Sequence, residues 1–106
     1  MKGTEVIQIA IGTYEVIFGL HENVTLSVEA HFLYTSKGRT YEWRPKDVHT
    51  AASTVNLLES TVVRVQAQED GTLELSFSNG DRLVVRDANK EYESYHITYS
   101  GGVIVV

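Results

Sequence analysis

The sequence predicts a mainly β protein (α+β): a strongly bent antiparallel meander or half-open barrel with one short helix. Apolar and polar residues alternate over several stretches, which is typical of strands with one buried face. Turn-forming residues separate these stretches, and only one segment has helical spacing. We expect roughly seven or eight strands, and a single sheet of that size would curl or fold over.

The N-terminal part of the chain is expected to form three strands. The stretch NVTLSVEAHFLY alternates throughout and predicts one long, half-buried strand, with His31 on its polar face. Upstream, the β-rich segment divides at Gly12 into strands of roughly 4–11 and 14–20, with one continuous bent strand as the alternative. The buried face of the long strand is expected to carry Val24, Leu26, Val28, Ala30, Phe32 and Tyr34.

The middle of the chain is expected to hold a loop and then the helix. The stretch TSKGRTYEWRPKD surrounds Gly38 and contains the only proline, which predicts a loop. The following stretch, DVHTAASTVNLLES, has apolar residues at helical spacing and Asp47 as a plausible N-cap. The helix is expected to cover one end of the core. Its apolar positions are Val48, Ala51, Ala52, Val55 and Leu58.

The C-terminal half predicts a meander. The strands are expected in STVVRVQAQ, TLELSF, RLVVRD, SYHITY and VIVV. The stretch SNGD predicts a hairpin, because Asn-Gly readily takes the two positive φ angles of a type I′ turn. The residues expected to point inward are Leu73, Leu75, Phe77, Leu83, Val85, Tyr95, Ile97 and Tyr99.

The composition of the chain limits the possible classes of function more than any sequence motif does. The 106 residues fit a single domain, 1–106, and carry a net charge of −5, which argues against nucleic acid as a partner. The basic residues concentrate between Lys37 and Lys46, so the rest of the chain is strongly acidic. With no cysteine, no signal peptide and no membrane-spanning run, a cytoplasmic protein is expected.

No catalytic or metal-binding pattern stands out in the sequence. The four histidines, His21, His31, His49 and His96, lie too far apart to form a local pair of metal ligands. No serine lies in a glycine-flanked elbow, and no glycine-rich loop has phosphate-binding spacing. We therefore expect no enzyme activity, no cofactor and no metal site.

The C-terminal half carries a recurring pattern of hairpin and core residues. It reads GTLELSFSNGDRLVV, then YESYHI, then SGGVIVV. In this it resembles a family of small bacterial β-rich proteins of unknown function with the pattern Gly-x-Leu-x-Leu-x-Phe-x-Asp/Asn-Gly-x-x-Leu-x-Val, Tyr-Glu-Ala/Ser-Trp and Pro-Gly-Gly. Tyr95 stands here in place of the tryptophan, and Ser100 in place of the proline. Small acidic proteins of this type also resemble immunity proteins, which bind and block a bacterial toxin.

The expected function is that of a non-catalytic protein-binding protein, an immunity protein that neutralises a toxin with a basic active-site surface. Acidic residues would steer the encounter and aromatic residues would anchor the complex. A monomer or weak dimer is expected. The expected partner contacts are Glu91, Tyr92, Glu93, Tyr95, Trp43, Glu69 and Asp70.

Two alternatives remain open. The first is a small-ligand-binding protein or enzyme that uses the mouth of the half-barrel, where Tyr92, His96 and Trp43 would meet. The second is a structural module that pairs through an exposed edge formed by the terminal VIVV.

Overall fold

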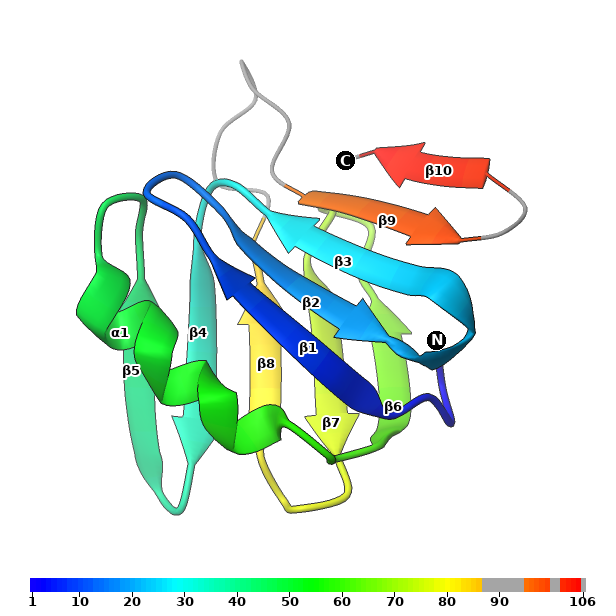
Figure 1. Ribbon diagram of the computed structural model, residues 1–106, viewed down its shortest axis with the longest axis horizontal. Helices are drawn as coiled ribbons and strands as arrows, with labels where there is room; N and C mark the ends of the chain where they lie inside the picture. Colours follow the sequence, from blue (N-terminus) through cyan, green and yellow to red (C-terminus); the bar gives the residue numbers. More distant parts are fainter. Residues whose placement is uncertain (87–94, 100–101, 106) are drawn as a thin grey trace.

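The protein folds into two antiparallel sheets that face each other (Figure 1). The computed structural model describes residues 1–86, 95–99 and 102–105. The first sheet has the order β1-β2-β3-β9-β10, and the second has the order β5-β4-β8-β7-β6. The strands are β1 Val6–Ile11, β2 Val16–Leu20, β3 Val24–Val28, β4 Phe32–Ser36, β5 Arg39–Trp43, β6 Val62–Ala67, β7 Leu73–Phe77, β8 Arg82–Val85, β9 Tyr95–Tyr99 and β10 Gly102–Val105.

The mainly β prediction with one short helix is confirmed, and the expected bend takes the form of two facing sheets. The division near Gly12 is also confirmed, because β1 and β2 lie on either side of it. More strands are present than expected for two reasons. The long alternating stretch forms two strands, β3 and β4, and the predicted loop after it contains β5.

The chain crosses from one sheet to the other between β3 and β4. Val28 and Phe32 are both buried although they belong to different sheets, whereas Ala30 between them, predicted to face inward, is only partly buried. His31 lies in the corner and is only 5% exposed. Its predicted place on a polar face is therefore wrong, because a corner residue does not follow the faces of a flat strand. A contact of 3.0 Å between His31 Nε2 and Glu42 Oε1 supplies a polar partner for the imidazole.

Two hairpin turns lie at the same end of the second sheet. In the β4–β5 turn, Lys37 and Gly38 both have positive φ, 52° and 78°, as a two-residue type I′ turn requires. In the predicted Asn-Gly hairpin between β7 and β8, only Gly80 has a positive φ. The hairpin is confirmed, but the type I′ turn is wrong. The turn is longer than two residues. The Phe77 amide donates a hydrogen bond to the Asp81 carbonyl at 2.9 Å, and the Gly80 amide donates one to the Phe77 carbonyl, so Ser78, Asn79 and Gly80 all lie within the turn.

Strand β1 is at the edge of the first sheet and β5 is at the edge of the second sheet. The helix α1 (Val48–Ser53) and the 3₁₀ turn η2 (Thr54–Leu57) lie along the side of the molecule between these two edge strands (Figure 1). The predicted N-cap is confirmed, since Asp47 Oδ1 accepts a hydrogen bond from the Thr50 amide at 3.0 Å. The buried side of this segment carries Ala51, Thr54 and Leu57. Thr54 is accommodated there because its hydroxyl donates to the Ala51 carbonyl at 2.7 Å.

Both sheets contribute to one hydrophobic core. Phe18 of the first sheet meets Phe32 of the second edge to face, with ring centroids 6.0 Å apart. Phe32 in turn stacks on Trp43 at 5.1 Å. The inward positions predicted for β7 and β8 are all buried, whereas in β9 burial falls from Tyr95 through Ile97 to the exposed Tyr99. The core is therefore filled by side chains contributed from both sheets and from the helical segment.

Within the part of the chain that the structure describes, no helix has the length and apolar character needed to cross a bilayer.

Candidate functional site

Trp43, predicted as a partner-binding anchor, belongs to the core instead. The residue is 1% exposed, and its ring lies against Phe32 at an interplanar angle of 13°. The basic neighbours that suggested an exposed loop belong to β5 and the segment after it. Trp43 therefore contributes to stability and does not offer its ring to a partner in this conformation.

The structure brings together three of the other predicted contacts, Tyr95, Glu69 and Asp70. Tyr95 is 4% exposed, and its hydroxyl donates to the Gly71 carbonyl at 2.8 Å, which joins β9 to the β6–β7 turn. Glu69 and Asp70 are exposed in that turn. Asp70 Oδ1 accepts a hydrogen bond from the Thr72 amide, and this bond lowers the pKa of the Asp70 carboxyl. Tyr95 is thus a structural residue beside an exposed acidic turn.

The remaining predicted contacts, Glu91, Tyr92 and Glu93, lie outside the described residues. The alternative pocket of Tyr92, His96 and Trp43 has one member outside the described residues and another in the core. His96 Nε2 lies 3.8 Å from Glu29 Oε1 on the neighbouring corner.

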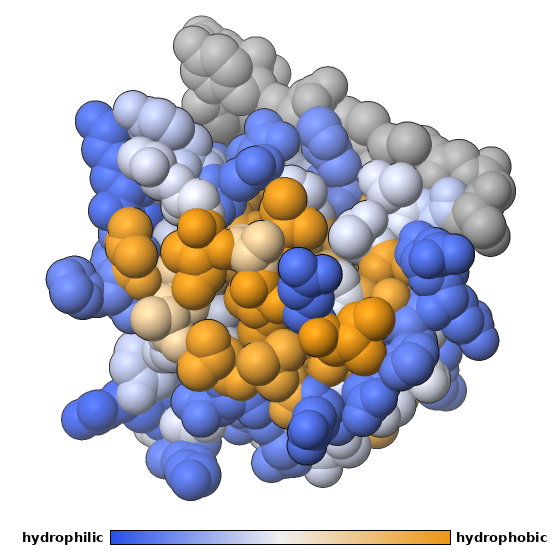
Figure 2. Space-filling view, in the orientation of Figure 1, coloured by the Kyte–Doolittle hydropathy of each residue, from blue (hydrophilic) through white to orange (hydrophobic). Residues whose placement is uncertain are grey.

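A band of aliphatic side chains crosses the face on which the helical segment and β1 lie (Figure 2). We define the aliphatic face by its four most exposed large residues: Ile7, Val48, Val55 and Leu58, which are 41–52% exposed. Three of them belong to the stripe that helical spacing predicted to be buried. Only Ala51 of that stripe is buried and the other members face solvent, because the 3₁₀ turn places Leu57 and not Leu58 over the core.

Acidic residues adjoin the aliphatic face. Glu59 directly follows Leu58, and its amide donates to the Val6 carbonyl at 2.8 Å, so the two elements lie side by side. Glu5 precedes β1 and pairs with His21, with Glu5 Oε1 and His21 Nε2 3.2 Å apart. An apolar centre with charged neighbours is the usual make-up of a protein-binding surface.

A second surface feature is a polar groove beside the two hairpin turns. The groove has a volume of about 580 Å³ and is open to solvent on one side. It lies where the β4–β5 turn, the β7–β8 turn and the 3₁₀ turn meet. The residues that line it are Ser36, Lys37, Arg39, Tyr41, Asn56, Asn79 and Asp81.

A buried carboxylate forms part of the groove wall. Asp81 is 4% exposed, and its Oδ2 accepts hydrogen bonds from the Tyr34 hydroxyl and from Asn79 Nδ2. Burial and the bond to Asp81 together raise the pKa of Tyr34 to about 12, so this hydroxyl remains a donor at neutral pH. The same Asn79 amide also donates to the Asn56 carbonyl at 3.2 Å, which ties the β7–β8 turn to η2.

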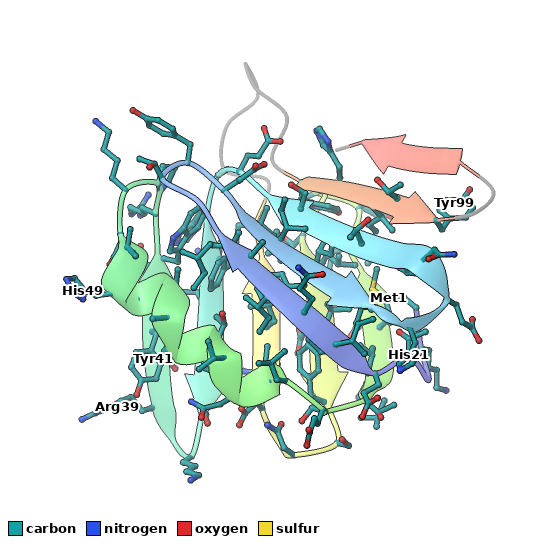
Figure 3. All side chains as sticks on the ribbon, viewed as in Figure 1. Met1, His21, Arg39, Tyr41, His49 and Tyr99 are labelled. Carbon is teal, nitrogen blue, oxygen red and sulfur yellow. The ribbon has the colours of Figure 1, made fainter. Side chains whose placement is uncertain are left out.

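The opposite wall of the groove is basic. Lys37 occupies the β4–β5 turn, and Arg39 begins β5. Figure 3 shows Arg39 and Tyr41 side by side on β5, and the guanidinium carbon lies 5.9 Å from the centre of the Tyr41 ring. The sequence indicated this basic segment and the Asn-Gly turn separately. It missed the groove because the two turns lie about forty positions apart and meet only through the pairing of β4 with β8.

No group of three or more histidine, aspartate or glutamate side chains able to hold a metal ion occurs among the residues that the structure describes. Three histidines, His21, His31 and His96, each approach a single carboxylate instead. These contacts are ion pairs or hydrogen bonds, and they do not assemble a coordination shell.

Comparison with known proteins adds the family. No curated protein and no solved structure matched the chain. A model of a family of unknown function, DUF6188, matches residues 1–106. Since this match covers the whole sequence, the protein belongs to the DUF6188 family.

Proposed function

We propose that the protein is a non-catalytic binding protein, an immunity protein that neutralises a bacterial toxin whose active-site surface is basic. The observation that carries this proposal is the aliphatic face. Four large aliphatic side chains, each about half exposed, lie together on a helical segment and the adjoining strand. Contiguous apolar surface of this kind is typical of sites that bind other proteins.

The charge of the chain supports a basic partner. A net charge of −5 attracts a cationic surface over distances of roughly a Debye length, about 8–10 Å at physiological salt. Glu59 beside the aliphatic face, and Glu69 and Asp70 in the β6–β7 turn, contribute exposed acidic groups. These residues increase the association rate, whereas the aliphatic side chains slow dissociation.

The filled core favours a binding surface over an enclosed ligand site. Trp43 and Tyr95, which the sequence predicts as partner contacts, are buried. No buried side-chain nitrogen or oxygen lacks a hydrogen-bond partner in the described part of the chain. An enclosed active site would instead present polar groups that await a substrate.

The test uses each toxin-like domain that the genome encodes beside the gene for this protein. Cells that produce the toxin should survive when this protein is co-produced, and the purified pair should form a complex whose dissociation constant rises with ionic strength. Absence of both protection and complex formation would refute the proposal. A complex that is insensitive to salt would refute the basic character of the partner while leaving protein binding intact.

A further inference from the structure

The polar groove is a second surface feature, distinct from the aliphatic face and independent of the proposed toxin binding. Its volume of about 580 Å³ falls in the range of small-molecule pockets, roughly 300–1,000 Å³. Three separate elements form it, and the hydrogen bonds of Asn79 hold two of them together. The groove is therefore a preorganised site and not a gap between independent loops.

Part of the polar lining is already committed to the fold. Asn79 uses its amide nitrogen on the Asn56 carbonyl and on Asp81 Oδ2, and its Oδ1 accepts from the Asp81 amide at 2.9 Å. The Tyr34 hydroxyl donates to the same Asp81 oxygen. These bonds fix the orientation of the Asp81 carboxylate with one oxygen turned into the protein.

The other carboxylate oxygen, Asp81 Oδ1, is available to a ligand. It accepts no hydrogen bond from the residues that the structure describes. Because no fully buried side-chain oxygen in that part of the chain lacks a partner, this oxygen reaches solvent, and Asp81 is one of the residues that line the groove. A negatively charged, oriented acceptor of this kind binds hydroxyl or ammonium donors.

The facing wall offers two cations. Neither Lys37 nor Arg39 forms an ion pair with a described residue, and Arg39 rests over the ring of Tyr41. A guanidinium that lies on an aromatic ring keeps its N–H edges free for bidentate contact with a carboxylate or a phosphate. Ser36 and Asn56 add neutral hydrogen-bonding groups between the charged walls.

We propose that the groove binds a small hydroxylated organic anion, a sugar that carries a carboxylate or a phosphate. The anionic group binds Lys37 and Arg39, and a hydroxyl on the same molecule donates to Asp81 Oδ1. An inorganic anion uses only the basic wall and is repelled by the carboxylate. A metal ion or an organic cation is repelled by the two basic side chains. The mixed lining therefore selects a molecule that combines both features.

The experiment is an NMR titration of the isotope-labelled full chain with glucuronate and glucose 6-phosphate. Glucose and inorganic phosphate, each of which carries only half of the required chemistry, serve as comparison probes. At least one of the two anionic sugars should shift the amide signals of both hairpin turns and bind more tightly than either comparison probe. The anionic sugar that binds more tightly identifies carboxylate or phosphate as the preferred group.

The matched variants are Lys37→Gln/Arg39→Gln and, as control, Lys2→Gln/Arg64→Gln. Both change the net charge equally and replace exposed residues, but only the first pair lines the groove. Loss of the charge-assisted contacts should weaken binding about tenfold or more in the first variant and little in the control. The proposal is overturned if neither anionic sugar binds more tightly than both glucose and inorganic phosphate, or if the two variants weaken binding equally.

Discussion

At the residue scale, the chain satisfies its buried polar groups through a few specific pairs. Tyr34 and Asp81 pair inside the second sheet, and His31 meets Glu42 at the corner between the sheets. Tyr34 and Asp81 lie 47 positions apart, whereas His31 and Glu42 belong to one hairpin. Local patterns correctly placed Tyr34 inward but did not predict its partner, because a pair of this kind depends on which strands are neighbours.

Tyr34→Phe tests the Tyr34–Asp81 pair. The substitution removes a donor from a buried carboxylate, and we expect a loss of about 1–3 kcal/mol in the free energy of unfolding. Tyr41→Phe is the control, because the Tyr41 ring stacks 6.0 Å from Tyr34 but its hydroxyl makes no hydrogen bond to the described residues. That variant should change stability by less than about 0.5 kcal/mol. Urea unfolding measures the stability of both variants. Equal losses would contradict a stabilising role for the Tyr34–Asp81 hydrogen bond.

His31 should make stability depend on pH near neutrality. Burial lowers the pKa of its imidazole below the ordinary value of 6.5, against the opposing effect of the hydrogen bond to Glu42. Since the unfolded chain keeps the ordinary value, it binds more protons than the folded chain between the two pKa values. The stabilisation is therefore fully present above pH 6.5 and declines as the pH falls below it.

The measurement is the free energy of unfolding over a series of pH values for wild type, His31→Gln and His21→Gln. The slope below pH 6.5 should become shallower in His31→Gln. It should persist in His21→Gln, since this side chain is 58% exposed beside Glu5. An unchanged slope in His31→Gln would show that the His31 imidazole does not cause the pH dependence of the free energy of unfolding.

At the element scale, the helical segment shows where sequence reasoning succeeds and where it fails. The helix and its Asp47 cap follow from local rules and are confirmed. The buried side does not follow, because the segment changes from α to 3₁₀ spacing at Thr54. Positions separated by three residues, Ala51, Thr54 and Leu57, face the core, whereas the predicted stripe apart from Ala51 faces solvent. The β5 strand was missed because its residues are mostly exposed and polar.

Neighbouring leucines provide the test of this assignment. Leu57→Ala should lower the free energy of unfolding by about 2–5 kcal/mol, because Leu57 is fully buried. Leu58→Ala changes the next residue, which is 41% exposed, and should cost less than about 1 kcal/mol. Thermal or urea unfolding of the two variants shows which of the two leucines packs against the core. A larger loss for Leu58→Ala would mean that the segment is rotated relative to the structure.

At the scale of the whole molecule, alternation and turn residues predicted the strands but not how they are divided between sheets. The corner at His31 and the return of the chain from β8 to β9 place sequential strands in different sheets. The polar groove and the aliphatic face both arise from that assembly. The residues of these two surfaces do not form a motif that is local in the sequence. The net charge and small size of the chain predicted a binding protein, but the aromatic residues predicted as its contacts, Trp43 and Tyr95, are buried.

The aliphatic face is the proposed toxin-binding surface. Val55 and Val63 permit a matched comparison, since both are 47% exposed and only Val55 belongs to the aliphatic face. Val55→Asp and Val63→Asp add the same charge, so any difference between them reflects position and not electrostatic steering. Thermal unfolding should first establish that both variants remain folded.

The deciding measurement is the dissociation constant of each variant for the toxin domain by isothermal titration calorimetry. We expect Val55→Asp to weaken binding about tenfold or more, because it puts a charge where the complex would bury an apolar side chain, and Val63→Asp to bind like wild type. Wild-type affinity in Val55→Asp, or an equal loss in both variants, would contradict the claim that this face makes the contact.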